Sequence, residues 1–469
     1  MSCDVCVVGA GPAGLAAAAV AARGGAVVAL IDAAPRPGGQ FWRHRPAGIA
    51  ADADLHHDIG LFTRLRPANV RYLPGHHVWT VSAGPAGGTV RAVGPGQDEV
   101  TVGARYLILA PGAYDRQIPF PGWDLPGVMT AGGVQALLKG HGVLAGPRVL
   151  VAGTGPFLLP VAAGLAARGG TVTGVHEANH PAGWLRRPSG WPGGAGKLAE
   201  AAGYARTLLR HRVPVRHRSA LVAAEGRDQV EAAVVAPVGR GGRIRLSGAR
   251  RIGTDVIAAG WGFTPQLELF LAAGCDTGLD TDGSLVVLAD GDQFTSQPRV
   301  LAAGEATGVG GATLAAIEGA LAGSAAAAAA GHRPLRADAV ARLRQRRARL
   351  RGFAQAMHRV YPVRAGWLDT VAGSTVVCRC EEVTAAQLRE ATELGATGVR
   401  AAKLLSRAGM GWCQARVCGY AAACLVARWT GTSYDPGGVA GRPLAVPVPL
   451  HTLAGQQDTA GPGASRSAD

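Results

Sequence analysis

The order of apolar and polar positions near the N-terminus predicts a strand–loop–helix–strand unit. In residues 3–32 an apolar strand runs into Gly9-x-Gly11-x-x-Gly14, an alanine-rich helical segment follows, and a second apolar strand ends at Asp32. Gly9 permits a tight turn, Gly11 admits a pyrophosphate close to the backbone, and Gly14 lets the helix pack on the strand. The free N–H groups at the helix start face the phosphates, and Asp32 lies where a carboxylate accepts hydrogen bonds from a ribose. The pattern therefore predicts a dinucleotide site.

A second segment, residues 148–178, repeats this order with Gly153, Gly155 and a terminal acid, Glu177. The third glycine position holds Leu158, which pushes the helix away from the strand or fills the space that a cofactor needs. We expect a second Rossmann-like unit here. Whether it binds NAD or another nucleotide such as ATP is left open. The alternative is a unit that keeps the Rossmann-like fold only as a structural scaffold and binds no nucleotide.

Three further segments favour FAD as the dinucleotide of the first unit. Residues 37–43 place two glycines and an amide shortly after Asp32, an apolar strand in residues 107–128 ends in Ala-Pro-Gly, and in residues 299–323 a strand ends at Gly-Glu before a glycine-rich loop and a helix. Together with the first loop, they supply the predicted cofactor-binding residues: Gly9, Gly11, Pro12, Ala13, Gly14, Asp32, Gly39, Gln40, Ala110, Gly112, Gly304 and Glu305.

Composition excludes several classes of protein. The chain has 469 residues, 48% apolar and 17% charged, which is typical of a globular protein of several domains. The formal charge is +15, but lysine is almost absent among the 47 basic residues, which is typical of a GC-rich genome, and no basic stripe carries interleaved aromatics, so nucleic acid is not expected as a partner. The alanine-rich segment 312–331 is expected to be a buried helix, not a membrane span. Eight cysteines without a secretory signal predict a reducing, cytoplasmic compartment.

Four of these cysteines form the pattern Cys-x-Cys and Cys-x4-Cys, in Cys378, Cys380, Cys413 and Cys418. Four thiolates bind either zinc or a [2Fe–2S] cluster. The hooks are unequal, glycines nearby allow backbone N–H groups to reach sulfur, and arginines 379, 407 and 416 offset cluster charge. These features favour [2Fe–2S], with zinc or no metal as alternatives. No cysteine occurs in residues 33–274, which excludes the redox cysteine pair of the disulfide reductases.

The stretches CRCEEVT (378–384) and GMGWCQARVCG (409–419), together with PGGQFWR and GEATGVGGATLAAIEGALAG, carry a resemblance to a known family. The chain resembles the FAD- and [2Fe–2S]-containing α subunits of dye-linked amine and amino-acid dehydrogenases: opine oxidase, D-hydroxyproline dehydrogenase, L-proline dehydrogenase and hydrogen cyanide synthase. Its C-terminal part resembles the bacterioferritin-associated-ferredoxin type of domain. The core is similar to that of sarcosine oxidase α.

The resemblance implies an α/β two-dinucleotide-domain flavoprotein, similar to glutathione and thioredoxin reductases, with a small helical [2Fe–2S] domain. It also implies an electron-transfer subunit fed by a β subunit of the amino-acid-oxidase type, passing electrons to an external acceptor, and in some relatives an FMN at the subunit interface. Two alternatives are left open: a self-contained NAD(P)H-dependent reductase and a scaffold subunit that does not turn over. No catalytic base or nucleophile can be named.

The expected organisation has six parts. They are 1–120 for the first FAD-binding segment, 121–261 for the Rossmann-like NAD(P)-type insert, 262–331 for the second FAD-binding segment, 332–368 for a basic helical connector, 369–432 for the [2Fe–2S] domain and 433–469 for an extended tail. The connector is expected to present a solvated basic face or to dock an acidic partner subunit.

Overall fold

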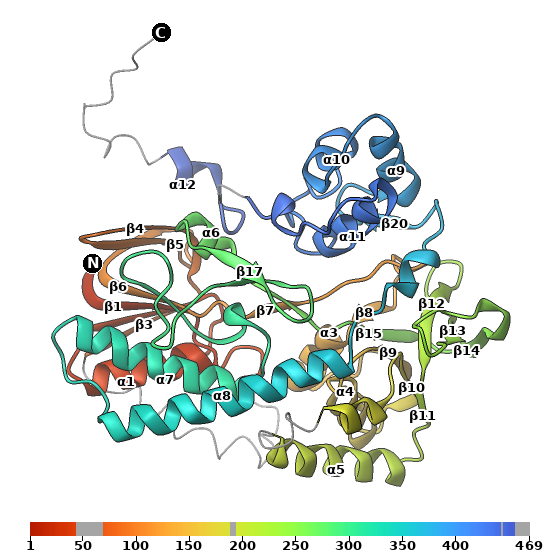
Figure 1. The fold of residues 1–469 in the computed structure, drawn as a ribbon, viewed down its shortest axis with the longest axis horizontal. Coiled ribbons are helices and arrows are strands. Elements are labelled where there is room, and N and C mark those ends of the chain that lie inside the picture. The colour runs from red at the N-terminus through yellow and green to blue at the C-terminus, as the bar shows by residue number, and fades with distance from the viewer. Residues whose placement is uncertain (44–68, 188–193, 442–443, 455–469) are drawn as a thin grey trace.

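A computed structural model describes residues 1–43, 69–187, 194–441 and 444–454, and its fold is shown in Figure 1. Two parallel α/β units lie side by side, and a small helical domain lies at the C-terminal end of the chain against them. This arrangement confirms the expected two-dinucleotide-domain architecture with an added helical domain.

The first unit contains a seven-stranded sheet whose strand order is β3-β2-β1-β6-β5-β4, with β19 paired to β6. Strands β1, β2, β3, β6 and β19 run parallel to their neighbours in that core, while β4 and β5 add antiparallel pairs at β6. The strands are β1 (Ser2–Val8), β2 (Val28–Asp32), β3 (Val70–Pro74), β4 (His77–Gly84), β5 (Gly87–Val93), β6 (Glu99–Leu109) and β19 (Val300–Ala302). The helices are α1 (Pro12–Arg23), α7 (Ala312–Ala329) and α8 (Ala337–Val360).

Helices α1 and α7 pack with their backbones almost in contact, which explains their alanine and glycine content. A Cβ atom added at Gly319 would lie 1.9 Å from the carbonyl oxygen of Ala13, and one at Gly323 would lie 2.3 Å from that of Ala17. By length and hydropathy alone α7 could cross a membrane, but 61% of it is buried inside the protein. Its apolar character is accounted for by this packing.

The second unit has a five-stranded parallel sheet in the order β11-β10-β9-β15-β8 and a three-stranded antiparallel sheet beside it. Its elements are β8 (Val128–Thr130), α3 (Ala131–Ala136), η2 (Leu137–His141), β9 (Arg148–Gly153), α4 (Leu158–Ala167), β10 (Thr171–Glu177), η3 (Pro181–Arg186), α5 (Ala195–Arg210), β11 (Val215–His217), β12 (Ser219–Glu225), β13 (Ala232–Pro237), η5 (Leu246–Gly248), β14 (Arg250–Gly253) and β15 (Val256–Gly260). Two antiparallel strands, β7 (Ala113–Asp115) and β16 (Phe263–Pro265), carry the chain into this unit and out again.

Short elements complete the first unit and build the C-terminal domain. After β16 come α6 (Glu268–Ala272), the hairpin β17 (Thr277–Leu279) and β18 (Leu285–Val287), and η6 (Gly304–Thr307). The C-terminal domain holds η7 (Ala365–Asp369), β20 (Val376–Cys378), β21 (Val383–Thr384), α9 (Ala385–Glu393), α10 (Val399–Ser406) and α11 (Gly419–Thr430). The expected extended tail contains a helical turn, η8 (Gly437–Val439), and a short helix, α12 (Leu450–Ala454); its residues 455–469 lie outside the described residues.

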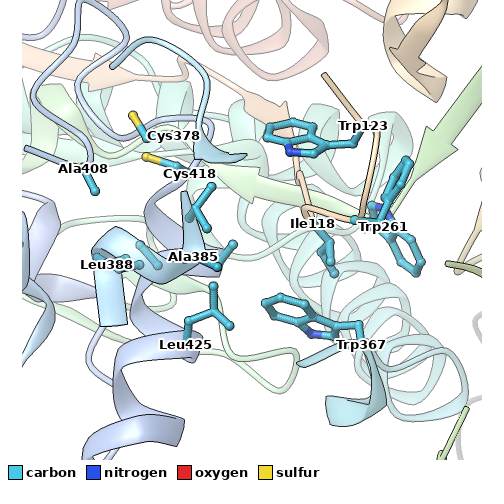
Figure 2. Close-up of a cluster of buried hydrophobic side chains, with 14 of the residues drawn as sticks. Ile118, Trp123, Trp261, Trp367, Cys378, Ala385, Leu388, Ala408, Cys418 and Leu425 are labelled. Carbon is cyan, nitrogen blue, oxygen red and sulfur yellow. The ribbon is translucent and has the colours of Figure 1, made fainter. Parts of the chain in front are cut away.

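The C-terminal domain shares one hydrophobic core with the second unit. Trp123, Trp261 and Trp367 lie between the five-stranded sheet and the helices of the domain, and Figure 2 shows them facing the side that carries Leu425 and Cys378. Trp123 is 2% exposed, and its indole N–H donates a hydrogen bond to the carbonyl of Val376 in β20. The domain is therefore packed on the body as part of the same core.

Replacing Trp123 with alanine tests this shared core. Because the change empties a large buried site and removes the bond to β20, we expect the free energy of unfolding in a guanidinium titration to fall by about 3–5 kcal/mol. Trp412→Ala is the matched control, since Trp412 is 77% exposed, and it should change stability by less than about 0.5 kcal/mol. Equal effects of the two changes would contradict a buried role for Trp123.

Candidate functional site

The predicted cofactor residues of the first unit come together at the carboxyl edge of the seven-stranded sheet. Gly9 has φ +100, and a Cβ there would lie 2.2 Å from the carbonyl oxygen of Ala110, so the loops after β1 and β6 touch. Gly39 lies over Gly11, with its Cβ position 3.0 Å from the Gly11 Cα. The carboxyl edge of parallel strands is where open α/β sheets bind ligands.

The loop after β19 joins the same edge. Gly304 has φ +82, and a Cβ there would lie 3.0 Å from the Cβ of Ala13 at the start of α1. Gly11 and Gly112 by contrast have nothing within 4 Å of a Cβ position, so the backbone is open to a ligand there. Pro12 occupies the first position of α1, where the missing N–H leaves no gap in hydrogen bonding.

Asp32 has the properties of a residue that binds a ribose. Burial raises its pKa from the ordinary value to about 6, against the lowering effect of backbone N–H groups at Ala10, Ala34 and Ala33. Its Oδ2 atom is buried and has no hydrogen-bond partner among the described residues. A buried carboxylate oxygen without a donor fits a ribose hydroxyl, so the site suits a dinucleotide.

Glu305 has visible partners within its own loop. Its two carboxylate oxygens accept hydrogen bonds from the backbone N–H groups of Gly310 at 2.8 Å and Gly311 at 2.9 Å. Burial raises its pKa. These contacts hold the turn that starts α7, and the interpretation that Glu305 also contacts the flavin stays a prediction.

Glu318 is a site residue that the sequence analysis did not assign. It is fully buried in α7, and its carboxylate accepts hydrogen bonds from the Gly304 N–H at 3.1 Å and the Thr307 hydroxyl at 2.9 Å. Arg351 and Arg347 of α8 form ion pairs with it at 2.5 and 3.2 Å. The available signal was one acid in an alanine-rich helix, followed by arginines four residues apart in the next helix.

Helix α8 is therefore a clamp on the cofactor loop as well as a connector. Arg351 also donates to the carbonyl of Gly308 at 2.6 Å, and His358 contacts the carbonyl of Val309 at 2.9 Å. The expected solvated basic face describes the exposed side of α8, where Arg342 pairs with Asp338. It does not describe Arg347 and Arg351, whose side chains are 23% and 17% exposed.

The second unit contains a Rossmann-like loop after β9. A carboxylate of the same unit, Glu177, binds the backbone of that loop. Glu177 accepts hydrogen bonds from the Gly155 N–H at 2.7 Å and from the Asn179 N–H at 2.8 Å. Gly153 has φ +140 and lies against Gly260, while Leu158 is buried at the start of α4. The backbone N–H that would meet a phosphate is thus used by a carboxylate, whose pKa burial raises.

Residues after α8 lie across the same loop. Asn179 donates to Thr154 at 2.6 Å and to the carbonyl of Pro362 at 2.9 Å, and Arg364 donates to the Asn179 side-chain oxygen at 2.8 Å. These contacts lie at the carboxyl end of β9, where a nucleotide would bind in this fold, although the space at Gly155 itself is open, with nothing within 4 Å of its Cβ position.

The structure brings the four cysteines near one another, and Figure 2 shows Cys378 and Cys418 side by side. Cys378, Cys413 and Cys380 all raise the pKa of the Cys418 thiol. In the part of the chain that the structure describes, no three His, Cys, Asp or Glu side chains are grouped so that they could hold a single metal ion. Four neighbouring thiols suit a binuclear cluster, in which each iron takes two thiolates.

The surroundings of Cys378 favour its thiolate form by lowering its pKa. The Cys418 thiol, and then the backbone N–H groups of Gly409, Glu381 and Cys380, lower its pKa to about 6. The Gly409 N–H lies 3.3 Å from the Cys378 sulfur. The thiolate is the form that binds metal, so this backbone arrangement favours a cluster ligand.

The three arginines that were expected to offset cluster charge have different surroundings. Arg407 pairs with Glu381 at 2.9 Å and Arg416 pairs with Glu268 at 2.9 Å, so a carboxylate balances each of these charges. Arg379 lies over the ring of Trp123 at 5.1 Å and donates to the Asp124 carbonyl at 3.4 Å. Of the three, Arg379 is therefore the one whose charge no carboxylate balances among the described residues.

The family model of the pyridine nucleotide-disulphide oxidoreductases matches residues 3–320. The chain belongs to this family. A second model, the BFD-like [2Fe-2S] binding domain, matches residues 376–428, which include all four cysteines. The predicted cofactor residues of the first unit, the Gly155 loop of the second unit and the four cysteines thus lie within the two matched ranges.

Relatives that match over most of their length are subunits of multisubunit enzymes. Hydrogen cyanide synthase subunit HcnB of Pseudomonas aeruginosa is 32% identical over 88% of this chain and 90% of its own. A relative from Agrobacterium tumefaciens, which is named as a subunit of opine oxidase, is 32% identical over 88% of this chain and 84% of its own. The structure of L-proline dehydrogenase from P. horikoshii, at 19% identity, shares the fold with a TM-score of 0.69 over 97% of this chain and 79% of that one.

The protein is an FAD-dependent oxidoreductase with a [2Fe–2S] domain. It differs from the disulphide reductases of its family because its cysteines lie outside residues 33–274, and Cys275 is a lone, buried thiol. The fold, the FAD and the cluster expected from the sequence are confirmed by these matches.

The raised pKa of Asp32 gives a pH test of FAD binding. The ionised carboxylate accepts hydrogen bonds from the ribose, and below about pH 6 the FAD-free site is protonated. We therefore expect the FAD dissociation constant, measured by flavin fluorescence with FAD-free protein, to rise as the pH falls through 6, by up to about tenfold per pH unit. Asp32→Asn should bind FAD weakly with a flat profile. An unchanged pH dependence in that variant would contradict the assignment.

Cys413→Ser tests the cluster assignment. Because the variant leaves one iron with a single thiolate, we expect iron and acid-labile sulfide to fall from about two of each per chain to near zero, while FAD content stays at the wild-type level. Cys424→Ser is the control, since Cys424 is a thiol of the same domain whose pKa burial raises to about 11. Full cluster content in Cys413→Ser would exclude Cys413 as a ligand.

Proposed function

We propose that this chain is the electron-transfer subunit of a multisubunit amine or amino-acid dehydrogenase. The observation that carries the proposal is its similarity, over nearly the whole chain, to subunits named for hydrogen cyanide synthase and opine oxidase. A partner β subunit of the amino-acid-oxidase type would oxidise the C–N bond of an opine, proline or hydroxyproline-like substrate. This chain would then pass the electrons to an external acceptor.

The two cofactors suit this role because they handle different numbers of electrons. FAD accepts two electrons together as a hydride equivalent, and a [2Fe–2S] cluster passes one at a time. The chain's own contribution is to hold both: the loops after β1, β6 and β19 would bind FAD, and Cys378, Cys380, Cys413 and Cys418 would bind the cluster. An FMN at the subunit interface, as in some relatives, belongs to the same proposal.

The second unit supports a partner rather than nicotinamide as the electron source. In an NAD(P)H-dependent reductase the Gly155 loop would have to receive a pyrophosphate, yet Glu177 accepts a hydrogen bond from the Gly155 N–H and residues 361–364 lie across the loop. We therefore favour the electron-transfer subunit over a self-contained reductase. A scaffold subunit would bind the same cofactors but leave them oxidised while its complex turns over.

The electron source can be tested with air-free holoprotein. We expect neither NADH nor NADPH to bleach the flavin absorbance within minutes, because the Gly155 N–H is already bonded to Glu177, whereas dithionite should reduce both flavin and cluster. Adding proline, hydroxyproline or an opine should have no effect on the chain alone. In complex with a β subunit of the amino-acid-oxidase type, one substrate of this class should bleach the flavin.

Either of two results would contradict the proposal. Rapid bleaching by NADH or NADPH would identify a self-contained reductase. Cofactors that stay oxidised while the complex oxidises its substrate would identify a scaffold subunit.

A further inference from the structure

The backbone of the second cysteine hook adopts an unusual conformation. Gln414 and Ala415, between Cys413 and Cys418, have φ of 52 and 61, in the left-handed region that residues with a side chain rarely adopt. The Gln414 side-chain amide donates to the carbonyls of Met410 at 3.1 Å and Gly411 at 3.0 Å, which holds the turn. Strained backbone of this kind persists where the surroundings require it.

The strained turn is followed by Arg416, whose side chain extends from the C-terminal domain to contact β7 and α6. Its guanidinium donates to the Tyr114 hydroxyl at 2.9 Å and pairs with Glu268 at 2.9 Å. It also donates to the carbonyl of Ala445 in the tail and, at 3.0 Å, to the carbonyl of Cys413. The side chains of Arg416 and Glu268 are only 11% and 7% exposed. One buried arginine thus joins a cluster ligand to three other segments of the chain.

Tyr114 links this contact to the predicted flavin site. It lies in β7, two residues after Gly112, whose left-handed backbone and open space place it at the carboxyl edge where the cofactor residues meet. From Gly112 the connection runs through Ala113 to Tyr114 along the chain, then through two hydrogen bonds of Arg416 to the peptide of Cys413. It is a continuous route from the flavin loop to a cluster ligand.

Charge does not explain why one side chain makes so many contacts. Glu268 balances the charge of Arg416, so the pair adds little to the field at the cluster. Buried ion pairs contribute little net stability over apolar residues, and their best attested role is to fix the register of two elements. The geometry therefore indicates a positioning role.

We propose that Arg416 is a positioning residue that sets the coupling between the flavin site and the cluster. The proposal rests on the proposed function, in which electrons pass between the two centres within this chain. In that step one electron leaves the reduced flavin and one oxidised cluster is reduced, with no atom transferred between them. Arg416 holds the Cys413 side of the cluster at a fixed place relative to the strand that leaves the flavin loop.

The test uses air-free holoprotein in which light reduces the flavin with electrons from an added tertiary amine, and cluster reduction is followed by its absorbance. We expect Arg416→Gln to slow flavin-to-cluster transfer by about tenfold, because a misplacement of reacting groups by about 1 Å can cost up to roughly a hundredfold in rate. Tyr114→Phe, which keeps the ring and Arg416, should slow it less, and Arg416→Lys should restore part of the rate. Arg428→Gln is the control, because Arg428 forms an exposed pair with Asp369 in the same domain.

Two further measurements separate positioning from other effects. The EPR line shape of the reduced cluster and its rate of reduction by a small mediator should be unchanged in Arg416→Gln and Tyr114→Phe. The double variant Arg416→Gln with Glu268→Gln removes both charges and should stay slow.

Wild-type transfer rates in Tyr114→Phe and Arg416→Gln, or a double variant restored to the wild-type rate, would overturn the role of Arg416. A wild-type protein whose cluster is not reduced after its flavin would instead contradict the proposed function.

Discussion

The packing of the C-terminal domain onto the second unit is the constraint on which the rest of the structure depends. Trp123 is buried under β20, and its indole N–H bonds the strand that ends in Cys378, so the cluster ligands are fixed to the same core as the five-stranded sheet. A cluster on a flexible linker would meet the flavin at many distances. Here the hydrophobic effect holds the domain in place, and buried polar contacts such as Arg416 with Tyr114 set the detail.

A second constraint acts at the cofactor edge of the first unit. Because α1 and α7 touch through their backbones at Gly319, the loop before α7 is brought against the loop before α1. Glu318 and Arg351 then fasten that loop to α8, the same helix whose end leads into residues 361–364 over the second unit. Helix α8 thus holds the Gly304 loop of the first unit, and the residues that follow it contact the second unit beside the Gly155 loop.

The sequence was most informative where the chemistry is local. The loop at Gly9, Gly11 and Gly14 could be predicted because each glycine answers to one steric need within a single βαβ unit, and the hooks at Cys378 and Cys413 because thiol spacing is a short-range signal. The way in which the two hooks come together depends on how about thirty intervening residues fold back, which spacing alone does not specify. Glu177 was ambiguous for a different reason: an acid at that position gives the same pattern whether it accepts from a ribose or from its own loop.

The contacts made by Glu318 and Arg416 could not be predicted, because each depends on segments far apart in the chain. The sequence shows a buried acid in an alanine-rich helix and an arginine inside a cysteine hook. Their partners become known only when the fold places α8 and β7 beside them. In the tail, the helix at Leu450–Ala454 was missed because it is short and surrounded by prolines and glycines, which favour an extended conformation.

The most direct test of the account is a stepwise reductive titration of the air-free chain, followed by visible absorbance and low-temperature EPR. The account predicts uptake of about three electrons per chain, two in the flavin and one that produces a [2Fe–2S]-type EPR signal only on reduction. Uptake of about two electrons with no such signal, and zinc found by metal analysis, would contradict a one-electron centre beside the flavin.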